Sequence, residues 1–282
     1  MEFPEINKVS ILGCGWLGLA LGEYLVKKGY EVNGSVTSDA KKPTLEAVGI
    51  KPYTIRLLPS PEGDNFKEFL DSDLLIISVP PARDPDEMET LHAQQITTIK
   101  NNVENLPISK VIYISSTSVY PNTNTTLNEN SDTAKDKAAK RILLAEAELR
   151  INTKLDATIL RCGGLMGYDR IPGKYFAGAK DLDTGHIPVN FVHRDDVIAI
   201  IEYIILKNDA NSWNKVFNVV AGKHPTRKEI YLKNAEEYGF EAPSFSADTS
   251  AQWKRVDGKK ITQKMGYKYK FDDPMGFEYS AQ

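Results

Sequence analysis

Short apolar runs alternate with amphipathic stretches along the first 165 residues of the chain. The apolar runs are rich in Val, Ile and Leu, which indicates strands. In the stretches between them apolar residues recur every three or four positions, which indicates helices. Strands are predicted in KVSILGCG, YEVNGSVT, KPYTIRL, DLLIISVP, KVIYISSTS and ATILRCGG, and helices in WLGLALGEYLVKKG, NFKEFLDS, METLHAQQITTIKNNVEN and DTAKDKAAKRILLAEAE. Strands that are apolar throughout and separated by helices predict a parallel sheet covered on both faces.

Beyond residue 165 the pattern loosens into GYDRIPGKYFAGAKDLDTGHIPV, which is typical of a long loop. A strand end and a helix follow in NFVHRDDVIAIIEYIILKN, then a last strand in FNVV and one more helix in TRKEIYLKNAEEYG. The sequence therefore predicts an α/β fold with a doubly wound parallel sheet. We expect residues 1–170 to form the main domain, 186–222 to return to it, and 171–282 to contain a small C-terminal lobe.

Composition is ordinary for a globular protein, with 41% hydrophobic and 26% charged residues and a formal net charge of −3. This charge gives no reason to expect nucleic acid or an acidic membrane as a partner. Cys14 and Cys162 are too few for a disulfide framework, and Cys14 is expected to be a small filler. We see no signal peptide and no apolar run of about 20 residues, so a cytoplasmic location is expected.

The stretch GCGWLG places Gly13, Gly15 and Gly18 in the spacing G-x-G-x-x-G between a strand and a helix. Gly13 would permit the tight turn, Gly15 would let a diphosphate approach the backbone, and Gly18 would allow close helix–sheet packing. The amides of Trp16 and Leu17 open the helix, where an anion is favoured. The motif predicts a Rossmann dinucleotide site; the alternative is a glycine-rich turn without a ligand.

The end of the second strand decides between NAD and NADP. NAD sites usually carry an acidic residue there, whereas in this sequence the position falls near Val36 or Thr37, and neither is acidic. Thr37 and Ser38, with Lys41 and Lys42, could meet a 2′-phosphate, which favours NADP over NAD. Two alternatives remain open: Asp39 turns toward the ribose, or the lysines are only solvated.

Five motifs occur in a characteristic order: GCGWLG, SVPPA (78–82), ISSTSVYP, ILRCGGLMG (159–167) and VNFVHRDDV (189–197). Together they resemble the extended short-chain dehydrogenase/reductases, in particular atypical members described as NAD-dependent epimerase/dehydratase-like. The resemblance covers Lys8 to about Val220. It implies an NAD(P)-binding oxidoreductase-type protein that acts on a sugar-nucleotide-like or other hydroxylated small molecule, bound beneath the small C-terminal lobe.

The resemblance also implies the catalytic residues. Ser116 corresponds to the residue that orients the substrate oxygen. The family then uses a Tyr-x-x-x-Lys pair on a helix, and here the cation corresponds to Arg141, or to Lys140 if the register shifts by one. Lys137 or Asp136 stands in place of the tyrosine. Arg141 can hold a ribose or a phosphate, but a guanidinium does not readily give up a proton, which makes it a poor substitute for the lysine.

Other groups could take over the role of the missing tyrosine. Tyr120 and Tyr168 are candidates, although Tyr120 ordinarily belongs to the loop scaffold in this family. His193 titrates near neutral pH, but a histidine between apolar neighbours is more often structural, and the following Asp195 or Asp196 is more often a helix N-cap. Chance matches to the Tyr-x-x-x-Lys spacing occur elsewhere: Tyr24 with Lys28, and Tyr203 with Lys207.

The remaining cofactor contacts are assigned by position. Val79 and Pro80 end the fourth strand and should pass beside the adenosine-side ribose. Ser115 belongs to the serine strand. Gly163 falls where the family brings its backbone close to the nicotinamide, although a tight turn would explain it equally well. No metal site is expected.

Two function classes remain. We interpret the chain as an enzyme with an atypical active site. The alternative is a non-catalytic NAD(P)-binding sensor, which the missing tyrosine favours. A homodimer is conceivable because family members often pair through a four-helix interface, which would include the helix at residues 133–151.

Overall fold

The computed structural model describes residues 4–57, 60–80, 90–103, 106–151 and 154–280. The chain forms two compact units. Unit 1 consists of Met1–Val119, Ala134–Arg161 and Ile198–Val216, and unit 2 of Tyr120–Thr133, Cys162–Val197 and Phe217–Gln282. The segment that returns to unit 1 is therefore shorter than the predicted 186–222, because residues up to Val197 belong to unit 2.

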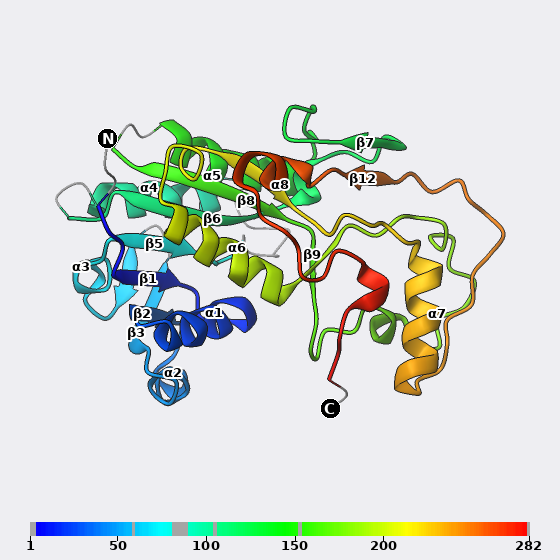
Figure 1. Ribbon diagram of the computed structural model, residues 1–282, viewed down its shortest axis with the longest axis horizontal. Coiled ribbons are helices and arrows are strands. Elements are labelled where there is room, and N and C mark those ends of the chain that lie inside the picture. Colours follow the sequence, from blue (N-terminus) through cyan, green and yellow to red (C-terminus); the bar gives the residue numbers. More distant parts are fainter. Residues whose placement is uncertain (1–3, 58–59, 81–89, 104–105, 152–153, 281–282) are drawn as a thin grey trace. The chain divides into compact units, whose positions relative to one another are not determined.

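The central sheet has the strand order β11-β8-β6-β5-β1-β2-β3-β4 (Figure 1). β1 pairs in parallel with both β2 and β5, the pairs β2–β3 and β5–β6 are also parallel, and β4 is antiparallel to β3. The strands are β1 Lys8–Leu12, β2 Glu31–Val36, β3 Lys51–Leu57, β4 Pro61–Gly63, β5 Leu74–Ile77, β6 Lys110–Ser116, β8 Asp156–Cys162 and β11 Val216–Val219. The order reverses at β1 and β5, so the predicted doubly wound α/β fold is confirmed.

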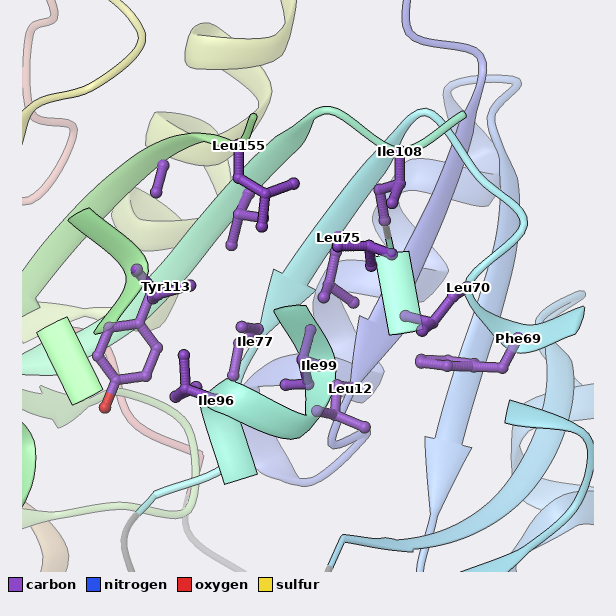
Figure 2. Close-up of a cluster of buried hydrophobic side chains, with 14 of the residues drawn as sticks. Leu12, Phe69, Leu70, Leu75, Ile77, Ile96, Ile99, Ile108, Tyr113 and Leu155 are labelled. Atoms are coloured by element: carbon purple, nitrogen blue, oxygen red, sulfur yellow. The ribbon is translucent and has the colours of Figure 1, made fainter. Parts of the chain in front are cut away.

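Helices pack on this sheet through alternating strand residues. Leu75 and Ile77 of β5 point to one face, because successive side chains of a strand alternate. On that face they join a buried cluster with Ile96 and Ile99 (Figure 2). The helices with residues in unit 1 are α1 Trp16–Lys27, α2 Lys42–Glu46, α3 Phe66–Phe69, α4 Leu91–Val103, α5 Lys137–Ile151 and α6 Arg194–Lys207. The start of the predicted helix at Met88 lies outside the described residues.

The buried stripe of α5 begins one residue later than its sequence predicts. The spacing of apolar residues predicts a stripe of Ala138, Ile142, Ala145 and Leu149, but Ala138 is exposed and Ala139 is buried. The Asp136 carboxylate accepts the N–H of Ala139 at 3.0 Å, which is typical of an N-cap and sets the start of the helix. The stripe then continues as expected through Ile142 and Ala145.

Unit 2 contains short elements. Its strands are three residues each and form two parallel pairs, β7 Thr125–Leu127 with β12 Lys254–Val256, and β9 Gly164–Met166 with β10 Phe191–His193. Its helices are α7 Arg227–Tyr238 and α8 Lys259–Met265. Thr226 and Glu229 form a capping box at the start of α7, where the sequence predicts a helix. Among the described residues, no helix combines the length and the apolar character needed to cross a membrane.

Asp196 has an anchoring role rather than the expected capping role. α6 already begins at Arg194, so Asp196 lies within its first turn. The Asp196 side chain is fully buried and accepts hydrogen bonds from the Tyr267 hydroxyl at 2.7 Å and from the N–H groups of Lys270 and Phe271 at 2.8 and 2.9 Å. It therefore attaches the C-terminal segment to the start of α6 within unit 2.

Candidate functional site

The corner between β1 and α1 requires glycine at two positions. Gly13 has φ of +99°, and a Cβ there would lie 2.9 Å from Cγ2 of Val79. A Cβ at Gly18 would lie 2.2 Å from the carbonyl oxygen of Gly13, closer than real Cβ contacts. The first turn of α1 therefore packs directly against the backbone of the β1–α1 corner, as the motif predicts.

Gly15 differs from Gly13 and Gly18 because the space beside its α-carbon is open. A Cβ added at Gly15 would meet no described heavy atom within 4 Å. Gly15 is the N-cap of α1 and provides no side-chain cap to the N–H groups of the first turn, which contains no acidic residue. The Leu17 side chain is buried, so Leu17 can offer only backbone atoms, whereas Trp16 is half-buried. First-turn N–H groups without a side-chain cap from Gly15, a helix dipole and open space fit a diphosphate.

Cys14 lies inside this corner but is inert. Its thiol is buried, and burial raises its pKa to about 12. Its backbone N–H donates to the Ser35 carbonyl at 2.8 Å, and the Ser35 hydroxyl accepts the N–H of Gly13 at 2.8 Å. Cys14 is thus a structural filler, as expected from the sequence.

A second feature of unit 1 lies at the end of β2. Thr37 and Ser38 line a pocket of about 300 Å³ together with Arg56 of β3. The guanidinium Nε of Arg56 donates to the carbonyl of Thr37 at 3.0 Å, which fixes this cation beside the two hydroxyls. Arg56 is not among the residues predicted from the sequence. The pairing of β3 with β2 places Arg56 beside Thr37, and no local motif indicates this contact.

The acids and lysines near this pocket are largely engaged with one another. The Asp39 carboxylate accepts from the Thr54 hydroxyl at 2.6 Å and pairs with Lys42 at 2.9 Å, and these contacts lower its pKa. Lys42 also pairs with Asp64 at 2.8 Å. Lys42 is therefore held by two carboxylates, which weakens the expectation that it meets a phosphate. Glu62 adds one further acid to the lining.

The serines at the end of β6 have different partners. The Ser116 hydroxyl accepts the N–H of Ser118 at 3.1 Å and is half-buried. The Ser115 hydroxyl donates instead to the buried Glu146 carboxylate at 2.6 Å, and Glu146 pairs with Arg161 at 2.6 Å. Ser115, which we had assigned to the cofactor, thus contributes its hydroxyl to a buried ionic network. The sequence could not distinguish the two serines, which face opposite sides of the strand.

The helix that should carry the missing tyrosine is α5. Lys137 is its first residue and is exposed, and Arg141 follows one turn later and is half-buried. The Tyr24 hydroxyl donates to Glu202, which also pairs with Lys28 at 3.0 Å. That match to the Tyr-x-x-x-Lys spacing is therefore part of the contact between α1 and α6. Tyr203 and Lys207 form a cation–π pair at 5.7 Å on α6.

Two predicted cofactor residues follow β5. Val79 is half-buried and adjoins Gly13, and Pro80 is exposed. Pro81 and Ala82, the rest of the motif SVPPA, lie outside the described residues. In unit 2, a Cβ at Gly163 would lie 2.3 Å from the Asn190 carbonyl oxygen, which gives this glycine a packing reason.

The proposed substitutes for the tyrosine have structural partners in unit 2. Tyr120 is buried and its hydroxyl donates to Asn218 at 2.8 Å. The Tyr168 hydroxyl contacts both carboxylate oxygens of Asp195 at 2.9 and 3.0 Å, and its backbone has φ of +55°. His193 is buried with its ring centroid 3.9 Å from that of Phe271, and burial lowers its pKa.

Comparison with known proteins supports the same architecture. No protein-family model matches the chain. Protein YeeZ of Escherichia coli K12 is 32% identical over 276 residues, which cover 96% of this chain and 98% of YeeZ. UDP-glucuronic acid 4-epimerase from Bacillus cereus, solved in complex with NAD, has a TM-score of 0.78 at 18% identity, with 96% and 97% of the two chains covered. A short-chain dehydrogenase/reductase superfamily protein from Agrobacterium tumefaciens with bound NAD has a TM-score of 0.77 at 14% identity, with 95% and 94% covered. The fold implied by the family resemblance is thereby confirmed.

Proposed function

We propose that this chain, which belongs to the YeeZ family and has the fold of the extended short-chain dehydrogenase/reductases, binds NAD(P) and acts on a hydroxylated small molecule. The observation that carries the proposal is the open side of Gly15 at the N-terminus of α1. The flanking glycines explain why the chain turns there, and the open space beside Gly15 at a helix N-terminus leaves room for a diphosphate. NAD in two structural neighbours supports the same assignment.

A bound nicotinamide would supply hydride chemistry, and the residues of the chain would position the reactants. The Ser116 hydroxyl accepts a backbone N–H, which leaves its own O–H to donate a hydrogen bond to a substrate oxygen. The guanidinium of Arg141 would hold a ribose or a phosphate. Neither group exchanges a proton readily, so we assign them orienting and binding roles.

We further propose that NADP is preferred over NAD. Arg56 stands beside the Thr37 and Ser38 hydroxyls, and this combination of a guanidinium and two hydroxyls suits a 2′-phosphate. Asp39 is the acid that would otherwise accept from the ribose hydroxyls, and it is engaged by Thr54 and Lys42.

The remaining assignments extend this proposal. A substrate of the sugar-nucleotide type is suggested by the UDP-glucuronic acid epimerase among the structural neighbours. We infer a homodimer through α4 and α5, where Leu144 keeps 39% of its surface exposed. A cytoplasmic location is in keeping with two buried free cysteines.

A second function is favoured by one observation. The resemblance implies Lys137 or Asp136 in place of the family tyrosine, and a chain without that tyrosine could bind the dinucleotide and signal its presence without catalysis. A structure with bound NADPH separates the two functions. An ionisable group within about 3.5 Å of both Ser116 and the reactive nicotinamide carbon would support the enzyme, and an apolar wall there would support the sensor.

Binding itself is tested by titrating the protein with NADPH and NADH and following tryptophan fluorescence, since Trp16 begins α1. The wild type should bind at least one of them saturably. The variant Gly15→Ala should fold and lose at least tenfold in affinity, because its methyl group occupies the open space. Gly276→Ala is the matched control, since its Cβ also meets no described atom within 4 Å. Absence of saturable binding, or equal affinity in Gly15→Ala, would refute the proposal.

A further inference from the structure

A small pocket in unit 2 has a strongly biased lining. Its volume is about 230 Å³, and the ten described residues that line it include Arg227 and Lys254 but no Asp or Glu. Asparagine and glutamine amides and two aromatic rings complete the lining. We propose that this pocket binds the single oxyanion, a phosphate or a carboxylate, of a compact sugar derivative.

The charge of the pocket comes from two separate elements. Arg227 is the first residue of the 12-residue α7, so the positive end of the helix dipole adds to its guanidinium charge. Lys254 lies on β12, and its ammonium donates to the carbonyl of Tyr120, which fixes its position. The nearest acid along α7 is Glu229, whose carboxylate is engaged with Thr226 in the capping box. The pocket therefore favours an anion.

A larger pocket of unit 2, whose lining carries charges of both signs, provides a comparison. Its volume is about 590 Å³, and it combines Arg255 and Lys259 with Asp257 and Asp272. The two cations there are balanced by two carboxylates, so that lining does not favour an anion over a cation. The smaller pocket differs in having cations alone among its charged lining residues.

One wall of the pocket is aromatic and supported from behind. Tyr231 lies one turn after Arg227 on α7, and its ring stacks on Phe176 with centroids 4.9 Å apart. Burial raises the pKa of Tyr231, so its hydroxyl stays protonated and can donate. A flat apolar face beside a cation and a hydroxyl donor suits the C–H face of a sugar that carries an anionic group.

Other lining residues of the pocket are held by hydrogen bonds. The amide nitrogen of Asn190 donates to the Lys254 carbonyl at 2.9 Å, and its amide oxygen accepts the N–H of Val256 at 2.7 Å. The Val189 carbonyl accepts from His224 at 2.9 Å, and its N–H donates to Pro225 at 2.8 Å. The pocket is therefore formed before any ligand arrives, which reduces the entropy lost on binding.

Size decides between a compact ligand and a nucleotide sugar. A volume of about 230 Å³ equals roughly eight water molecules at about 30 Å³ each. Pockets that enclose drug-sized ligands measure about 300–1,000 Å³. The pocket thus has room for a phosphate or carboxylate and part of one sugar ring, and it is too small to enclose a nucleoside diphosphate sugar.

Isothermal titration at low salt tests this inference, with glucose 6-phosphate, glucuronate, glucose and UDP-glucose as probes. At least one of the first two should bind, and glucose should bind at least tenfold more weakly. Arg227→Gln should weaken binding of the anionic probe about ten- to a hundredfold, the usual loss for a charged hydrogen bond. Arg227→Lys should keep most of it. Lys228→Gln removes the adjacent exposed cation of α7, which is not part of the lining, and should change nothing.

Three results would overturn the inference: binding of glucose as tight as that of its phosphate, equal losses in Arg227→Gln and Lys228→Gln, or tighter binding of UDP-glucose that depends on Arg227. The interpretation of the ligand as a substrate rests on the proposed action on a hydroxylated small molecule, with a compact sugar derivative in place of a sugar nucleotide, but the titrations need no dinucleotide. Failure here would leave the Gly15 test unaffected, and failure of dinucleotide binding would leave the oxyanion pocket to be judged by its own titrations. Melting temperatures of the variants show whether each one is folded.

Discussion

The buried ion pair between Glu146 and Arg161 gives the sharpest test of how unit 1 is held together. The side chains of Glu146 and Arg161 are only 3% and 7% exposed. The carboxylate accepts hydrogen bonds from Nη2 of Arg161 and from the Ser115 hydroxyl, each at 2.6 Å. The pair connects α5 to the ends of β6 and β8. In Glu146→Leu, the guanidinium and the hydroxyl stay buried and lose this shared acceptor.

The cost follows from these contacts. Breaking a buried pair by removing one partner costs about 3–5 kcal/mol. The hydrogen bond from the Ser115 hydroxyl has a charged acceptor and adds about 1.5–3 kcal/mol. Glu146→Leu should therefore lower the free energy of unfolding by about 5–8 kcal/mol, a large part of the ~5–15 kcal/mol typical of a folded protein. The double variant Glu146→Leu/Arg161→Met removes both charges and should recover at least about 3 kcal/mol of that loss.

Urea unfolding followed by tryptophan fluorescence measures these changes, since Trp16 and Trp213 belong to unit 1. The control lies on the same helix: Glu148 pairs with Lys100 at 2.9 Å, but the two side chains are 33% and 16% exposed. Because solvent screens this pair, Glu148→Leu should cost about 1 kcal/mol or less. A loss in Glu146→Leu no greater than in Glu148→Leu would refute the reasoning, as would a double variant as unstable as the sum of its single variants.

Four further outcomes are expected. Arg56→Gln should weaken NADPH binding about tenfold and leave NADH binding unchanged in fluorescence titrations; equal losses would argue against a 2′-phosphate contact. Gly18→Ala places a Cβ 2.2 Å from the Gly13 carbonyl oxygen, so it should lower both the melting temperature and NADPH affinity. Burial lowers the pKa of His92, so on acidification the unfolded state binds a proton at higher pH than the folded state does. The free energy of unfolding should therefore fall from pH 7.5 to 5.5, and less steeply in His92→Gln. The same pH dependence in both proteins would contradict this. Leu144→Glu should shift a dimer to monomer in analytical ultracentrifugation if α5 forms the interface, and a dimer that survives would exclude this face.

The sheet and its helices could be predicted because their signal is local. Strands buried on both faces must be apolar throughout, and that pattern marks β1, β5 and β6 without knowledge of their partners. The one-residue error at Ala138 and Ala139 arose because alanine fits a buried face and an exposed one equally well. Strands β7 and β12 were missed, since each has three residues and pairs with a partner more than 120 positions away.

The same distinction between local patterns and contacts between distant residues applies to the candidate site. The glycine corner is one continuous stretch, so the sequence shows all of it. Arg56 and Glu146 act at a distance along the chain: Arg56 reaches Thr37 through strand pairing, and Glu146 reaches Ser115 across a helix–strand contact. Glu146 also violates the apolar pattern of a buried helix face, and that irregularity was the available signal for the ionic network. Sequence patterns predict where the backbone turns, but they do not predict which side chains from distant parts of the sequence contact that turn.

The loss of the family tyrosine separates two properties that usually occur together. The tyrosines nearest Ser116 along the chain are Tyr113 and Tyr120, and their hydroxyls are bonded at 2.8 Å to His92 and Asn218, respectively. Both phenols are buried, so neither is exposed to a substrate. The resemblance implies Lys137 or Asp136 in place of the tyrosine, and the first turns of α5 carry the cations Lys137, Lys140 and Arg141, which attract anions. Under the proposed function, dinucleotide binding would depend on the glycine corner, whereas turnover would need a proton donor from outside β6 and α5, so mutation could remove either property without the other.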